Sequence, residues 1–196
     1  MTGVFHQDKP SLRRVPWLWK LASLHIGAYV ACGLFFGLPS NGLEWMQAGL
    51  LLINLIWISI IDFERFEIPD AASIALCVSG ALSLFMLPEF DRMDHVLAGV
   101  IFPSLLLFVA LVFRLLRGHQ GLGLGDVKLS AGIGLWVGLD GVILVLLGSA
   151  SAALFTLVVL SVWRGGGLRA MRNSGIAFGP FLCLFTWVAW LKGLGA

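Results

Sequence analysis

Two aspartates stand where apolar runs meet polar turns, and as a pair they could perform acid–base chemistry. Asp62 follows the apolar run that ends at Ile61, and Asp126 precedes the run that starts at Val127. Two carboxylates held close together cannot both ionise, so such a pair shares one proton. The ionised member can draw a proton from water while the protonated member donates a hydrogen bond to a carbonyl group. The alternative interpretation is two interfacial caps that reach water.

A glycine-rich loop, residues 121–125, leads directly into Asp126. Gly123 and Gly125 tolerate backbone conformations that other residues avoid and would let an extended peptide come close to the carboxylate. A flexible hinge with Asp126 as a helix cap is the structural alternative. The GxxxxGK[ST] pattern of a phosphate loop is missing. Lys128 is expected on another side of the same helix, first as an interfacial anchor and second as an electrostatic helper.

The segment after the first aspartate carries three more acids. Glu64 and Glu67 are either solvated loop charges or groups that attract a basic peptide at the membrane surface. Asp70 follows Pro69 and precedes Ala71, and this order predicts that Asp70 caps the next helix.

Composition indicates what holds these residues in place. Hydrophobic residues make up 59% of the 196 residues, charged residues 12%, and the mean hydropathy is +0.94. Because a membrane-spanning helix needs about 20 apolar residues, the chain has room for six or seven spans and little else. A net charge of +2 with scattered basic residues gives no indication of a nucleic-acid partner. The three isolated cysteines are interpreted as packing residues.

The predicted fold class is an all-α, polytopic membrane helix bundle. Residues 1–20 are predicted to be a cytoplasmic N-terminal tail, and residues 21–196 a single membrane-embedded domain. Seven apolar runs are candidate spans: Leu21 to Leu38, Leu43 to Ile61, Ala71 to Leu87, Val96 to Leu116, Val127 to Leu139, Val142 to Trp163 and Ile176 to Leu191. The run from Val127 is short for a full span and is a candidate for a tilted or partly re-entrant helix.

The basic residues predict the orientation of the bundle. With the N-terminus inside, every Lys and Arg except Arg92 and Lys192 falls on the cytoplasmic side. The second span then ends, and the fifth begins, at the cytoplasmic boundary. Asp62 and Asp126 are therefore expected at the same depth, where a carboxylate is costly unless it is paired, hydrated or functional.

Three motifs in this order resemble those of the prepilin peptidases, the type IV leader peptidases, which are membrane aspartyl proteases of the GxGD kind. The likeness spans about residues 43–190. It rests on Asp62 followed by Ile68-Pro69-Asp70, on Gly123-Leu124-Gly125-Asp126-Val127-Lys128, and on Phe178-Gly179-Pro180-Phe181-Leu182. The resemblance implies that Asp62 and Asp126 are the catalytic acids. Phe178, Gly179 and Pro180 either line their pocket or form the turn that starts the last helix.

The resemblance also implies an activity and a substrate. The expected enzyme is an aspartic endopeptidase of the cell inner membrane that removes the short basic leader of a prepilin or pseudopilin at the cytoplasmic boundary. Longer members of the family carry CxxC pairs and also methylate the new N-terminus. This sequence has no CxxC, so we expect a compact, peptidase-only form with no zinc or other cofactor and with doubtful methyltransferase activity.

Two other classes and one question of protonation remain open. A proton-coupled transporter also uses intramembrane carboxylates, but it predicts them near the bilayer midplane. A noncatalytic membrane assembly subunit has no need for acids at matched depth. Within the peptidase hypothesis, the helix dipole predicts that Asp126, at a helix N-terminus, is the ionised base and that Asp62, at a helix C-terminus, is the protonated partner.

Overall fold

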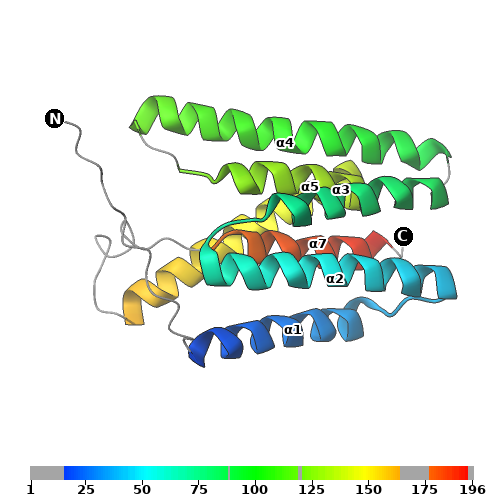
Figure 1. The fold of residues 1–196 in the computed structure, drawn as a ribbon, viewed down its shortest axis with the longest axis horizontal. Coiled ribbons are helices and arrows are strands. Elements are labelled where there is room, and N and C mark those ends of the chain that lie inside the picture. Colours follow the sequence, from blue (N-terminus) through cyan, green and yellow to red (C-terminus); the bar gives the residue numbers. More distant parts are fainter. Residues whose placement is uncertain (1–15, 88, 119–120, 164–176, 194–196) are drawn as a thin grey trace.

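The computed structural model describes residues 16–87, 89–118, 121–163 and 177–193, which form an all-α helix bundle (Figure 1). This arrangement confirms the predicted fold class. The helices are α1 (Pro16–Phe36), α2 (Gly42–Arg65), α3 (Asp70–Ser83) with the short 3-10 helix η1 (Leu84–Met86), α4 (Glu89–Arg117), α5 (Leu124–Trp163) and α7 (Gly179–Gly193). Helix α1 begins at Pro16, so the end of the expected N-terminal tail is helical, and residues 1–15 lie outside the described residues.

The helices have the length and surface of a membrane protein. Three described segments are long and apolar enough to cross a bilayer, namely Gly42–Arg65, Asp91–Arg117 and Leu124–Trp163, and His25–Phe36 and Asp70–Met86 are shorter apolar helices. In Asp91–Arg117 only 17% of the most apolar window is buried inside the protein. A soluble monomer does not expose so continuous an apolar face, whereas lipid covers it in a membrane.

Helix α2 is bounded by local chemistry at both ends. At its start, Asn41 accepts a hydrogen bond from the Glu44 N–H at 2.9 Å and donates one to Glu44 Oε1 at 2.7 Å, which satisfies groups that the first turn leaves unpaired. At its end, Phe66 adopts the left-handed conformation with φ 53° and its N–H donates to the backbone oxygen of Asp62 at 2.9 Å. This cap stops the helix one turn after Asp62.

Helix α5 is broken at Gly138, which has φ 67° and ψ −178°. The sequence predicted the division at Asp140-Gly141, two residues later, so the division is confirmed and its position corrected. Helix α4 stabilises the break, because Asp94 Oδ2 accepts the Leu139 N–H at 2.9 Å and His95 Nδ1 lies 3.0 Å from the Leu135 oxygen. After the break, α5 runs back toward the end of the bundle where it began (Figure 1).

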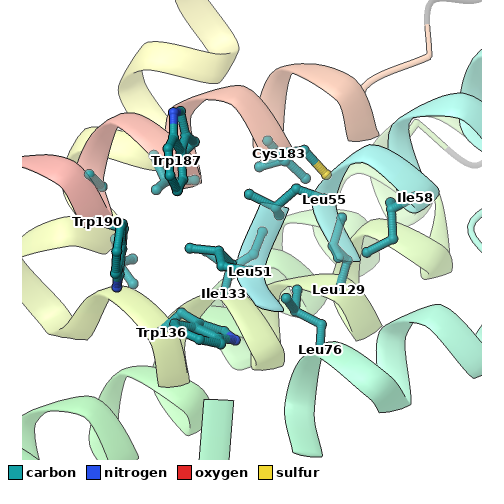
Figure 2. Close-up of a cluster of buried hydrophobic side chains, with 14 of the residues drawn as sticks. Leu51, Leu55, Ile58, Leu76, Leu129, Ile133, Trp136, Cys183, Trp187 and Trp190 are labelled. Carbon is teal, nitrogen blue, oxygen red and sulfur yellow. The ribbon is translucent and has the colours of Figure 1, made fainter. Parts of the chain in front are cut away.

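Before the break, residues 124–137 span only about 20 Å of helix, against a hydrocarbon core of about 30 Å. This part of α5 was predicted to be short, and it lies at the centre of the bundle. Figure 2 shows Leu129, Ile133 and Trp136 of α5 facing side chains of α2, α3 and α7. All three are at most 3% exposed, and Trp136 Nε1 donates to Ser79 Oγ at 3.2 Å.

Glycines set how closely α3 and α4 approach α5. A Cβ at Gly132 would lie 3.0 Å from the Cys77 nitrogen of α3, and one at Gly134 would collide with the Ala98 carbonyl group of α4. Small residues at such contacts let membrane helices pack backbone against backbone. Cys183 is fully buried in this core, and Cys32 packs against it, in agreement with their predicted packing role. The predicted turn at residues 165–167 lies outside the described residues.

Candidate active site

Asp62 and Asp126 line one cavity of about 750 Å³ at one end of the bundle. The two residues are far apart in sequence and come from different helices. Asp62 lies in the last turn of α2 and is 4% exposed, and Asp126 lies in the first turn of α5 and is 8% exposed. The cavity lining is Asp62, Phe66, Glu67, Ile68, Pro69, Asp70, Gly121, Leu122, Gly123, Leu124, Gly125, Asp126, Lys128 and Phe178. We call Asp62 and Asp126 the acid pair.

The side chain of Asp62 is held by a residue from the opposite end of the chain. Its Oδ2 accepts a hydrogen bond from the Gly179 N–H at 2.9 Å, at the start of α7. A Cβ on Gly179 would lie 2.7 Å from the same oxygen. The cap of α2 by Phe66 fixes the backbone of Asp62, so both its main chain and its carboxyl group have specific partners.

The glycine loop, residues 121–125, positions Asp126. The backbone N–H of Asp126 donates to the Gly123 oxygen at 3.2 Å, and a Cβ on Gly123 would lie 3.2 Å from Asp126 Oδ2. A Cβ on Gly125 would lie 3.1 Å from the Cβ of Ile68. The loop therefore passes close to both the carboxylate and the α2–α3 loop, and the approach of an extended peptide beside it stays a prediction.

The two carboxyl groups belong to residues that line the same cavity. Both are buried, and two like charges held close in a site of low dielectric disfavour each other, so a single shared proton stays the prediction for this pair. The hydrogen bond from the Gly179 N–H to Asp62 also affects which of the two acids holds a proton. The helix-dipole argument did not include this hydrogen bond. Which acid carries the proton stays a prediction.

Asp70 and Lys128 lie at the exposed mouth of the cavity and correct two sequence expectations. The residue at the cap position of α3 is Pro69, and Asp70, in the first turn, makes no capping hydrogen bond. Lys128 Nζ instead donates to Asp70 Oδ1 at 2.7 Å. Lys128 lines the same cavity as Asp126, although the sequence placed it on another side of α5, because its long side chain reaches across to the start of α3.

The remaining predicted residues divide into those at the cavity and those outside it. Glu67 and Phe178 line it, whereas Glu64 is exposed and is not among the lining residues. The residues Gly179 and Pro180 begin α7 and are buried, which confirms the predicted helix start, and Phe178 shows that the same motif also reaches the pocket. Sequence reasoning missed Phe66, Ile68, Pro69, Gly121, Leu122 and Leu124 as lining residues, although all lie within or beside the two motifs.

The chemistry of the cavity is that of a pair of acids. Its two buried carboxyl groups can divide the roles of base and hydrogen-bond donor toward one bound water molecule. Within the described ranges, no three His, Cys, Asp or Glu side chains are grouped as metal ligands would be.

Comparison with known proteins gives one family. The model of the type IV leader peptidase family matches residues 49–158. A prepilin leader peptidase/N-methyltransferase of Stutzerimonas stutzeri is 32% identical over 84% of this chain and 57% of its own length. Proteins of the same name from Pseudomonas aeruginosa and Aeromonas hydrophila are 32% and 31% identical over 92% and 76% of this chain, and over 59% and 51% of their own lengths.

This chain therefore spans somewhat more than half the length of the curated relatives that it matches. No solved structure matches it significantly. The family match includes both members of the acid pair and ends before α7.

Proposed function

This chain belongs to the type IV leader peptidase family, and from that membership we propose that it is a membrane aspartic endopeptidase that removes leader peptides from prepilins or pseudopilins. The observation that carries the proposal is the acid pair. Asp62 and Asp126 come from two helices, are both buried, and line one cavity. Two buried carboxylates at one cavity are costly for a bundle that needs only to be stable, which favours a functional role.

Hydrolysis follows from the shared proton. The ionised acid takes a proton from the bound water molecule as the water oxygen attacks the scissile carbonyl carbon. The protonated acid donates a hydrogen bond to the carbonyl oxygen and stabilises the negative charge that develops there. Collapse of the tetrahedral intermediate breaks the C–N bond, and the leaving nitrogen receives a proton from the acid pair.

The position of the cavity suits a substrate that is partly in water and partly in the bilayer. Glu67 and Asp70 are exposed at its mouth and would attract a basic leader. The apolar helix that follows such a leader would lie in the membrane beside the bundle. On this proposal the protein is in the inner membrane, with the acid pair on the cytoplasmic side.

The position of the acid pair also separates the peptidase from a proton-coupled transporter. Asp62 lies in the last turn of α2 and Asp126 in the first turn of α5, at helix ends and not at helix centres. A transporter relay would place its carboxylates near the middle of the spans. The position of the two acids therefore favours the peptidase.

Cleavage of a prepilin peptide by the purified protein in detergent tests the proposal. We expect Asp62→Asn and Asp126→Asn each to lower kcat by at least about a thousandfold, because neither asparagine can exchange the shared proton. Asp140→Asn is the matched control, since Asp140 is exposed and lies beyond the break in α5. Full cleavage by either acid-pair variant, or none by the unmodified protein, would contradict the proposal.

A further inference from the structure

The hydrogen bonds of the first turn of α7 leave one N–H group free to bind outside the helix. The N–H groups of Phe181 and Leu182 both donate to the Phe178 oxygen, at 3.1 and 3.2 Å, and Pro180 has no N–H. Only the Gly179 N–H is directed away from the helix, and it donates to Asp62 Oδ2 at 2.9 Å across 117 residues of sequence. The N–H groups of Gly179, Phe181 and Leu182 therefore all have acceptors, and Pro180 has no N–H to satisfy.

This contact requires glycine at residue 179. A Cβ there would lie 2.7 Å from Asp62 Oδ2 and 3.1 Å from its carboxyl carbon, closer than a carbon atom can approach an oxygen atom without displacement. The Asp62 side chain would have to move to relieve this contact, and it could do so only by leaving its position against the Gly179 N–H. Any other residue would push the carboxyl group away from the amide that binds it.

We propose that Gly179 is a positioning residue for Asp62, and that it acts through its main-chain N–H. The proposal rests on the proposed function. With Oδ2 bound to the amide, the carboxyl group of Asp62 cannot rotate freely, and Oδ1 is left for the bound water or the substrate carbonyl. A preset orientation of this kind lowers the reorganisation that the reaction requires.

An amide-to-ester replacement at residue 179 removes the N–H that binds Asp62, and it also weakens the Phe178 carbonyl oxygen as an acceptor for the first turn of α7, an effect that the control below addresses. Glycolic acid incorporated there by nonsense suppression keeps the size of glycine and replaces the N–H with an oxygen atom. We expect kcat to fall about ten- to one-hundredfold, because misplacement of a catalytic group by about 1 Å can cost about a hundredfold in rate, while KM changes by less than about twofold. Gly179→Ala should lower kcat at least as much, because its Cβ displaces the same oxygen.

The matched control is the same ester replacement at Phe181, whose N–H bonds within the turn to Phe178. It removes a backbone hydrogen bond from the same helix end without touching Asp62, so kcat should stay within about twofold of the unmodified protein. An equal loss of kcat in both ester proteins would show a merely structural effect and overturn the proposal. So would an unchanged kcat in the residue 179 ester, or a raised KM alone.

Asp62→Asn in the same assay separates this proposal from the proposed function. If the residue 179 ester is fully active while Asp62→Asn is inactive, the peptidase stands and the positioning role fails. If the unmodified protein fails to cleave, the proposed function itself fails.

Discussion

The ion pair between Lys128 and Asp70 joins α5 to α3, and both of its side chains are exposed. The side chains are 55% and 69% exposed, and their N–O distance is 2.7 Å. Exposed pairs contribute little because solvent screens them and holding two long side chains together costs entropy. Because the ion pair lies at the mouth of the cavity, it could affect both stability and substrate binding. Its effect on stability is therefore measured by itself.

We expect Lys128→Gln to change the free energy of unfolding by less than about 1 kcal/mol. Thermal or denaturant unfolding of the purified protein in detergent measures this change. A double-mutant cycle with Asp70→Asn isolates the pair, and its coupling should decrease as salt is added. A coupling that is large and insensitive to salt would show that the pair is shielded from solvent.

Single residues also show how far sequence reasoning reaches into the site. Asp62 and Asp126 were predicted because each lies at the edge of an apolar run, where burying a charged side chain is costly unless that side chain has a function. The Gly179 hydrogen bond and the Ile68 contacts were not found, since they depend on distances between segments that no local pattern encodes. Phe66 was missed for a different reason, because the left-handed conformation that it adopts is rare for a residue other than glycine.

Among the helices, contact between α4 and α5 depends on a residue without a side chain. A Cβ on Gly134 would collide with the Ala98 carbonyl group, which belongs to a helix backbone and cannot move alone. We expect Gly134→Ala to lower the free energy of unfolding by about 1–3 kcal/mol, the usual cost of overpacking. Unfolding of the protein in detergent, followed by circular dichroism, measures this loss.

Gly49→Ala is the control for Gly134→Ala because it makes the same chemical change in α2, where a Cβ would meet nothing within 4 Å. It should raise stability by up to about 1 kcal/mol, since alanine loses less conformational entropy in a helix. Opposite signs for the two variants are the expected result. Equal effects would mean that helix propensity, and not the α4–α5 contact, determines the outcome.

The break in α5 depends on an acceptor in α4. Asp94→Ala leaves the Leu139 N–H without its carboxylate partner and should lower the free energy of unfolding by about 1–3 kcal/mol. Asp94→Asn retains an acceptor oxygen at nearly the same position and should lose less than half as much. Unfolding curves of the two variants give the comparison, and an equal loss in both would show that the negative charge, not the acceptor, stabilises the break.

Element boundaries were predictable where they depend on nearby residues. The sequence placed α2 from Leu43, and the helix begins at Gly42, because the Asn41 cap is local. The break in α5 was placed two residues late because Asp140-Gly141 has turn composition, whereas the actual position is fixed at Gly138 by residues of another helix. Lys128 was misplaced because helical periodicity indicates where a side chain starts, not how far it reaches.

For the whole molecule, the distribution of basic residues predicts a direction in the membrane. Lys and Arg favour the cytoplasmic side, and on this rule the end of α2 and the acid pair are predicted to lie there. Ser40, just before α2, and Glu67, just after it, are both exposed and are separated by the whole helix. At 1.5 Å per residue, 24 residues of helix extend about 36 Å, enough to put the two positions on opposite faces of a bilayer.

Cysteine labelling tests this orientation. In intact spheroplasts we expect a membrane-impermeant maleimide to react with Ser40→Cys, and to react with Glu67→Cys only after the membrane is permeabilised. The unmodified protein is the background control, because it measures any labelling of the half-buried Cys32 and Cys77 and of the buried Cys183. Labelling of Glu67→Cys in intact spheroplasts, with Ser40→Cys protected, would reverse the orientation and put the acid pair on the wrong side for a leader peptide held in the cytoplasm. The helix assignment does not depend on the orientation of the bundle. Such a result would therefore show that the prediction from the distribution of Lys and Arg in the loops was wrong, and it would leave the fold unchanged.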